Sequence, residues 1–266
     1  MIMAFRDNSV LISTAAAQDV AADNSDGIFN GADGANAFVI ASGNVGDDTF
    51  LNFGSDDSII TGRQIFDGNN DGFIAFGPNG VLDVNRTGGG ARRAGNDQLQ
   101  VVGENGVDIT EIRYLGTKGG NFAYADSATL RQLNTTFGAD NVVEGDVSDD
   151  VIDMSDGAKV LLHDNGLGLN LGSDVVNGFG SDDLFVTTSK LFDRTGNDIV
   201  TFGGNDVLDT SGAEGPMSSD PSTGPGGQVD FTGIDGLAFL GETVGANGVT
   251  YYYYGTTDTT VDPFAG

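Results

Sequence analysis

The stretch FGSDDSIITGRQIFDGNNDGFIAFGPNGVLD (Phe53–Asp83) occurs twice in this chain, the second time in altered form. A shift of 126 residues places it without a gap on FGSDDLFVTTSKLFDRTGNDIVTFGGNDVLD (Phe179–Asp209), and 14 of the 31 positions are identical. Many other positions exchange like for like, such as Ile65 with Leu191. Because chance does not produce a gapless match of this length, the sequence predicts an internal duplication.

The similarity extends outward with small gaps. Asp23–Ala35 resembles Asp146–Ala158, and Val107–Ile112 resembles Val229–Ile234. We therefore predict two homologous units, residues 22–126 and 145–255. The remaining parts are an N-terminal extension strand in residues 1–21, a helical linker in residues 127–144 and a C-terminal tail in residues 256–266.

Both units consist of short β-like runs, such as AFVIAS (37–42), which Gly, Asn or Asp separate at the spacing typical of all-β proteins. We expect an all-β fold built as a β-roll or β-helix, with two β-sandwich units as the alternative. One short helix is expected within Asp126–Asn141, where Ser127 can cap it and Leu130 and Leu133 share a face.

The charge is strongly acidic. The chain has 39 acidic and 11 basic residues, a net charge of -28, and 34 of the acids are Asp. Asp favours turns and holds its carboxylate close to the backbone, which suits calcium sites built from turns. An acidic proteome in a salt-adapted organism would give the same bias. A charge of this size predicts no nucleic-acid partner and no attraction to anionic membranes.

Acidic turns recur between the β-like runs, each with a Gly followed by Asp. Calcium can bind between stacked turns of this kind through carboxylates and backbone carbonyls. The candidate metal ligands in these turns are Asp47, Asp48, Asp56, Asp57, Asp174, Asp182, Asp183, Asp193, Asp198 and Asp206.

Two of these segments carry a family resemblance. GSDVVNGFGSDDLFVTT (172–188) and GDDTFLNFGSDDSIIT (46–61) resemble segments near the C-terminal ends of RTX, or haemolysin-type, calcium-binding repeats, and GGNDVLD (203–209) resembles part of one nonapeptide. The resemblance covers about a third of the chain, and no tandem nonapeptide run is present. It implies a bacterial protein that a type I system exports and that folds in extracellular Ca²⁺.

The turn DGNNDG (Asp67–Gly72) matches the start of an EF-hand loop, but its twelfth residue is Pro78 and its flanks read as strand. We therefore expect a calcium turn in a β-fold, with Asp67, Asn69, Asp71 and the carbonyl of Phe73 as ligands. A metal-free Asx turn is the alternative. The copy, DRTGND (193–198), should bind more weakly because it loses two of the three side-chain ligands.

Other candidate sites are less specific. Tyr251 and Tyr253 face one side of a strand and Tyr252 and Tyr254 the other, which suits core packing, a subunit contact or stacking on sugar. Arg113 and Tyr114 have no counterpart of the same type in the second unit, so the pair is a candidate ligand or interface site specific to the first unit. The single histidine, His163, is expected to be structural.

The basic segment NRTGGGARRAG (Asn85–Gly95) has no counterpart in the second unit, which carries SGAEGPMSSDPSTGPGG (Ser211–Gly227) instead. Arg92 and Arg93 can attract an acidic partner, including another copy of this chain, although a solvated loop is the simpler interpretation. The strand-like SVLIST (Ser9–Thr14) is a second candidate for self-association through strand addition.

These features predict a secreted, calcium-binding surface or matrix protein of bacteria with a structural role, which self-assembles into a filament or sheet. Structural Ca²⁺ is the expected cofactor. The alternative is an enzyme or lectin that acts on polysaccharide, although no residue pattern marks a catalytic site. No cleaved signal peptide is expected, because Asp7 lies where basic residues belong, and no apolar run is long enough to insert in a membrane.

Overall fold

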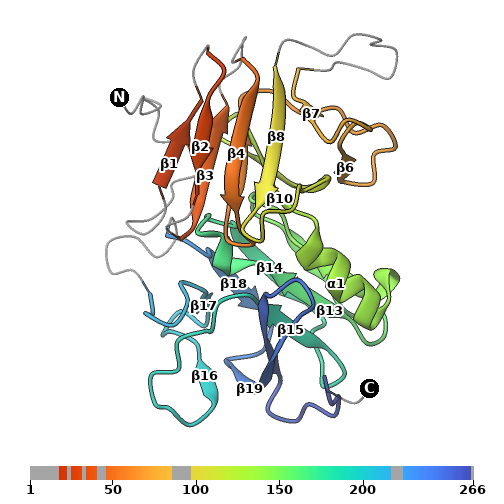
Figure 1. Ribbon diagram of the computed structural model, residues 1–266. Coiled ribbons are helices and arrows are strands. Elements are labelled where there is room, and N and C mark those ends of the chain that lie inside the picture. The colour runs from red at the N-terminus through yellow and green to blue at the C-terminus, as the bar shows by residue number, and fades with distance from the viewer. Residues whose placement is uncertain are drawn as a thin grey trace. The chain divides into compact units, whose positions relative to one another are not determined.

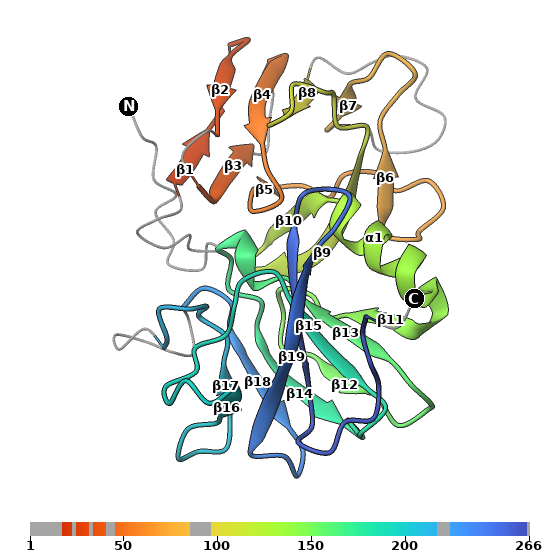
Figure 2. The ribbon, with the colours of Figure 1, turned by 60° about the horizontal axis from the view of Figure 1, so that its bottom comes forward.

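Figures 1 and 2 show the computed structural model, which describes residues 18–22, 25–31, 34–40, 46–85, 97–216 and 224–264. The chain divides into two compact units, Met1–Ser127 and Ala128–Gly266. Within the described residues, each unit contains a six-stranded and a four-stranded sheet. The predicted all-β fold with a short helix is confirmed.

The first unit forms its larger sheet in the order β1-β3-β5-β10-β9-β6 and its smaller one in the order β2-β4-β8-β7. The strands are β1 (Gln18–Ala21), β2 (Ile28–Asn30), β3 (Asn36–Ile40), β4 (Asp48–Phe53), β5 (Ser58–Thr61), β6 (Phe73–Ala75), β7 (Leu82–Asp83), β8 (Gln98–Gly103), β9 (Glu111–Lys118) and β10 (Asn121–Asp126).

The second unit repeats this topology strand for strand. Its larger sheet has the order β11-β13-β15-β20-β19-β16 and its smaller one the order β12-β14-β18-β17, so each strand corresponds to the one numbered ten lower. The strands are β11 (Val142–Glu144), β12 (Val151–Asp153), β13 (Val160–His163), β14 (Ser173–Asn177), β15 (Leu184–Thr187), β16 (Ile199–Thr201), β17 (Leu208–Asp209), β18 (Gln228–Phe231), β19 (Gly236–Val244) and β20 (Thr250–Gly255).

In each unit the chain begins as a two-sheet roll. Strands β1 to β5 alternate between the two sheets, and their neighbours within each sheet are parallel. Figure 2 shows β1, β3 and β5 on one side of β2 and β4. One coil takes 18 residues from Gln18 to its partner Asn36, and 24 from Val160 to Leu184. The topology is that of a β-roll, as the sequence predicts.

Antiparallel strands complete each roll. In the first unit β10 pairs with β5, β9 with β10, and β6 with β9.

The tight return between coils requires glycine at Gly172, whose φ is 103°. A Cβ there would lie 1.9 Å from the carbonyl oxygen of Ser148 in the preceding coil, closer than any side chain tolerates.

The core of each unit lies between its two sheets. In the first it is built around Phe38, Phe50 and Tyr124, and in the second around Phe185, Phe231 and Tyr254. These large side chains come from alternating positions of strands in both sheets, so their burial joins the two layers.

The helix α1 (Ala128–Phe137) packs in the second unit, where Leu133 joins a cluster that contains Tyr251 and Tyr253. Two 3₁₀ turns, η1 (Ala139–Asn141) and η2 (Asn165–Leu167), complete the helical elements of the described residues. The predicted helix is thus present. The hydroxyl of Ser127, its predicted cap, donates to the carbonyl of Glu111 at 3.3 Å.

One strand of each unit lies outside the repeat boundaries that the sequence predicts. Strand β1 lies in the predicted extension and β11 in the predicted linker, yet each pairs with the next strand of its own sheet. The strand-like SVLIST lies outside the described residues. Among the described residues, no helix is long and apolar enough to cross a membrane.

Candidate metal-binding turns and an acidic cavity

The Gly-Ser-Asp-Asp turns of the two units are held by one carboxylate each. Oδ2 of Asp57 accepts the amide of Gly54 in its own turn at 2.7 Å, and Oδ1 accepts the amide of Asn36 in the preceding coil at 2.7 Å. Asp183 makes the same pair of bonds, with Gly180 and Lys159, both at 2.8 Å. These aspartates therefore join successive coils through backbone amides.

Aspartates at the first residues of strands in the smaller sheets also bond to the backbone of the preceding coil. Oδ1 of Asp48 accepts the amide of Gly27 at 2.9 Å, and Oδ1 of Asp174 accepts the amide of Asp150 at 3.0 Å. The exposed Asp47 accepts the amide of Gln98 at 3.0 Å. In both units, therefore, the carboxylates of acidic residues at the turns form hydrogen bonds to backbone amides of a neighbouring coil.

Several of these carboxylates are buried. Burial raises the pKa of Asp57 to about 7, and burial together with the neighbouring Asp150 raises that of Asp174 to about 7. Burial also raises the pKa of Asp183. A buried carboxylate near other carboxylates destabilises the fold when it is ionised, and a bound cation would offset that cost.

The DGNNDG turn is organised around Asp67. Its Oδ1 accepts the amides of Asn69 and Asn70 at 3.1 and 3.0 Å, and its Oδ2 accepts the amide of Gly72 at 2.9 Å. The side-chain amide of Asn69 donates to Asp71 at 2.8 Å. The turn therefore gathers two carboxylates and an amide oxygen, which are hard ligands suited to Ca²⁺.

The copy of this turn keeps the central aspartate and changes its surroundings. Asp193 accepts the amides of Thr195, Gly196 and Asp198 at 2.8 to 2.9 Å. The hydroxyl of Thr195 donates to Asn197, so a hydroxyl and an amide replace the amide and carboxylate of the first unit. The two turns share a backbone shape but differ in ligand chemistry.

The described residues contain no group of three or more His, Cys, Asp or Glu side chains close enough to hold a metal ion. A calcium ion at the turns would therefore need backbone carbonyls or water for the rest of its ligands. The remaining candidates, Asp56, Asp182 and Asp206, lie at turns, and Asp182 and Asp206 are exposed.

The structure places the tyrosine run mostly in cores. Tyr251 and Tyr253 pack with α1, Tyr254 packs between the sheets, and all three are buried, while Tyr252 is half-buried against the same inner core. Core packing on both faces of β20 accounts for the run. This burial leaves no exposed pair of rings.

Arg113 and Tyr114 lie on β9. Arg113 is 2% exposed, and its guanidinium donates to the backbone carbonyl of Asp126. The Tyr114 ring packs on Tyr124, with 5.4 Å between the ring centres.

His163 is buried at the end of β13. Its Nε2 donates to the carbonyl of Gly226 and lies 2.9 Å from the hydroxyl of Thr210. Burial lowers the pKa of His163 to about 4. A neutral imidazole thus joins the coil to the segment after β17, which agrees with a structural role.

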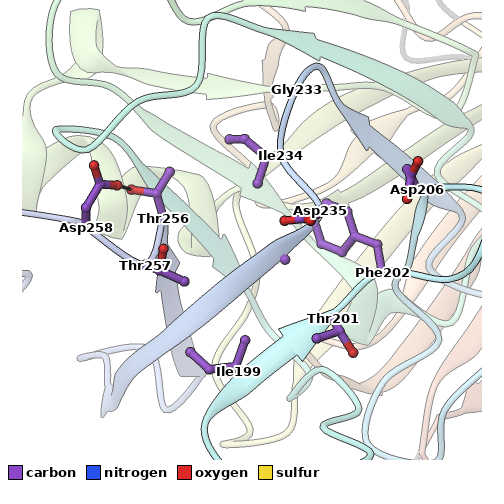
Figure 3. A pocket seen from close by; sticks show the side chains of 11 residues that line it. Ile199, Thr201, Phe202, Asp206, Gly233, Ile234, Asp235, Thr256, Thr257 and Asp258 are labelled. Carbon is purple, nitrogen blue, oxygen red and sulfur yellow. Dashed lines mark hydrogen bonds between the residues drawn. The ribbon is translucent and has the colours of Figure 1, made fainter.

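The second unit also has a surface cavity of about 500 Å³ (Figure 3). Three carboxylates from separate segments line it, those of Asp206, Asp235 and Asp258, together with the half-buried ring of Phe202. The sequence singled out Asp206 as a metal ligand but not Asp235 or Asp258. In a chain so rich in Asp, only the fold distinguishes the ones that share a cavity.

Comparisons with protein-family models, with curated proteins and with solved structures found no significant match to this chain.

Proposed function

We propose that this protein is a calcium-dependent structural protein of the bacterial surface or extracellular matrix, and that its copies associate with one another. The observation that supports it is the set of turn aspartates, with Asp57 and Asp174 both buried and both bonded to the preceding coil. Ca²⁺ bound near these turns would neutralise them and so favour the folded state.

An extracellular role follows from the calcium requirement. Extracellular calcium modules bind with dissociation constants on the order of 10⁻⁴ to 10⁻³ M, which are matched to the Ca²⁺ concentration outside cells. A chain with a net charge of -28 would stay expanded before export and fold afterwards. The resemblance to RTX repeats agrees with this order of events and with export by a type I system.

Calcium titration into chelator-treated protein tests the proposal. We expect a gain of β-sheet signal in circular dichroism and a higher melting temperature in millimolar Ca²⁺, because a ligand at about ten times its dissociation constant stabilises by about 1.4 kcal/mol per site. Mg²⁺ at equal ionic strength is the control for screening. An unchanged spectrum and melting temperature in Ca²⁺ would refute it.

A further inference from the structure

The acidic cavity of the second unit has walls suited to one kind of ligand. Figure 3 shows Phe202 and Ile234 on one side and Thr256, Thr257 and Asp258 on another. No Lys, Arg or His is among the residues that line it. Ionised carboxylates accept hydrogen bonds and carry negative charge, so this lining favours a ligand that donates hydrogen bonds and is positively charged.

The first unit suggests a ligand, because it carries an arginine on the strand that corresponds to β19, at the position of Ala238. Arg113 lies directly opposite Phe73, and its guanidinium reaches the carbonyl of Asp126. In the second unit the residue opposite Ile199 is Ala238. The second unit therefore lacks a guanidinium opposite Ile199, which lines the cavity.

Two residues that line the cavity have direct equivalents in the first unit. Ile199 corresponds to Phe73, and Thr256 corresponds to Asp126. The surrounding strands are also equivalent, because the amide of Phe76 bonds to the carbonyl of Thr110 as that of Phe202 bonds to the carbonyl of Asp235. The structure therefore places Thr110 on Asp235, three residues further along than the sequence match of Val107–Ile112 with Val229–Ile234.

Both units carry acidic residues at positions that line the cavity or correspond to its lining. In the first unit they are Asp108, Glu111 and Asp126, which correspond to Gly233, Gly236 and Thr256. In the second they are the three aspartates of the cavity. The negative charge is thus kept in both units, whereas the arginine is present in only one.

We propose that the cavity of the second unit binds an arginine side chain from the Asn85–Gly95 segment of another copy of this chain. That segment contains Arg86, Arg92 and Arg93, three of the 11 basic residues of the chain, and the corresponding segment of the second unit has none. A guanidinium offers five donors to the carboxylates and stacks on an aromatic ring such as Phe202.

The contact would be heterologous, since a segment of one unit meets a cavity of the other. Each copy carries one segment and one cavity, so association continues into a filament unless it closes into a ring. This inference rests on the self-association in the proposed function, and it identifies the two surfaces that make the contact.

A mixing experiment with two variants of the full chain tests it in saturating Ca²⁺. One variant neutralises the cavity (D206N/D235N/D258N) and the other the segment (R86Q/R92Q/R93Q). We expect sedimentation velocity to show concentration-dependent polymers for the wild type and monomers for each variant alone. An equimolar mixture should form a dimer that does not grow, because only one contact survives.

A matched control removes three exposed acids of the second unit that do not line the cavity (D156N/E214Q/E242Q), and it should polymerise like the wild type. The variant A238R supplies the cavity with its own guanidinium, as Arg113 does in the first unit, and should abolish association. Salt at 0.5 M should weaken the contact at least tenfold, since the cavity carboxylates are exposed.

A synthetic peptide of residues 85–95 gives a readout that is independent of polymer growth. It should bind the segment variant at one site in calorimetry and fail to bind the cavity variant. A wild-type monomer at all concentrations, or equal binding of the peptide to both variants, would overturn the proposal. Either result leaves the calcium titration unaffected, so the two proposals fail separately.

Discussion

The hydroxyl of Tyr254 accepts a hydrogen bond from the backbone amide of Leu191 at 2.9 Å. Tyr124 and Ile65 make the same bond in the first unit at 2.8 Å. In both units this bond ties the segment after the last parallel strand of the larger sheet to the antiparallel strand beside it. The duplication therefore preserves buried hydrogen bonds as well as strand order.

Removal of this hydroxyl should destabilise the second unit. In Y254F, the buried amide of Leu191 loses its partner, and we expect a loss of about 1–3 kcal/mol in the free energy of unfolding. Y252F is the matched control on the same strand, where the half-buried ring should tolerate the change within about 0.5 kcal/mol. Denaturant unfolding measures both, and equal losses would contradict the role of the bond.

The paired aspartates of a Gly-Ser-Asp-Asp turn should differ sharply. D183A removes the acceptor of two amides, of Gly180 and Lys159, and should cost about 1–3 kcal/mol. D182A changes an exposed side chain and should be nearly neutral in chelator. If D182A alone lowers the calcium affinity, then Asp182 is a ligand while Asp183 supports the turn. A neutral D183A would refute the capping role.

Stability in chelator should fall as pH rises. Asp57 and Asp174 have a pKa of about 7 in the folded state against 3.8 ordinarily, so the folded state holds more protons between pH 4 and 7. Their contribution is fully present below about pH 4 and is lost as pH rises through 7.

His163 opposes this trend, because its pKa falls from 6.5 to about 4 on folding and its contribution is lost as pH falls. The variant H163Q removes this opposing effect and retains a donor for Gly226. We therefore expect the melting temperature of H163Q in chelator to fall from pH 5 to pH 8 more steeply than that of the wild type. A rise over this range would contradict the pKa assignments.

The two copies of the DGNNDG turn should differ in calcium affinity. D71N removes one of two carboxylates in the first turn and should weaken its binding by about tenfold or more. N197D adds a carboxylate to the second turn and should create or strengthen a site there. Terbium luminescence or calorimetry on the full chain measures both. Identical binding in wild type, D71N and N197D would exclude these turns as sites.

The sequence predicts the duplication and the β-roll because its longest repeated stretch contains residues that turn geometry and core packing both constrain. Phe53, Asp57 and Leu82 all recur at a shift of 126, and the structure shows each buried in a core or bonded at a turn. Residues at such turn and core positions are the same in both copies, so the repeat can be recognised in the sequence.

The sequence match does not include the first strand of each unit, for the opposite reason. Strands β1 (QDVA) and β11 (VVE) share one residue at equivalent positions, Val20 and Val143, because a short edge strand is held largely by backbone hydrogen bonds that most side chains permit. The acidic cavity cannot be predicted from the sequence because Asp206, Asp235 and Asp258 lie far apart in the chain. No spacing rule brings them together without the fold.

The most direct test of the central claim is the location of calcium in crystals of the full chain grown in Ca²⁺, from anomalous scattering. We expect ions at the turns, bound by oxygens of residues such as Asp67, Asp71, Asp57 or Asp174, with backbone carbonyls or water as the remaining ligands. Turns without any ion, in crystals grown in millimolar Ca²⁺, would contradict it.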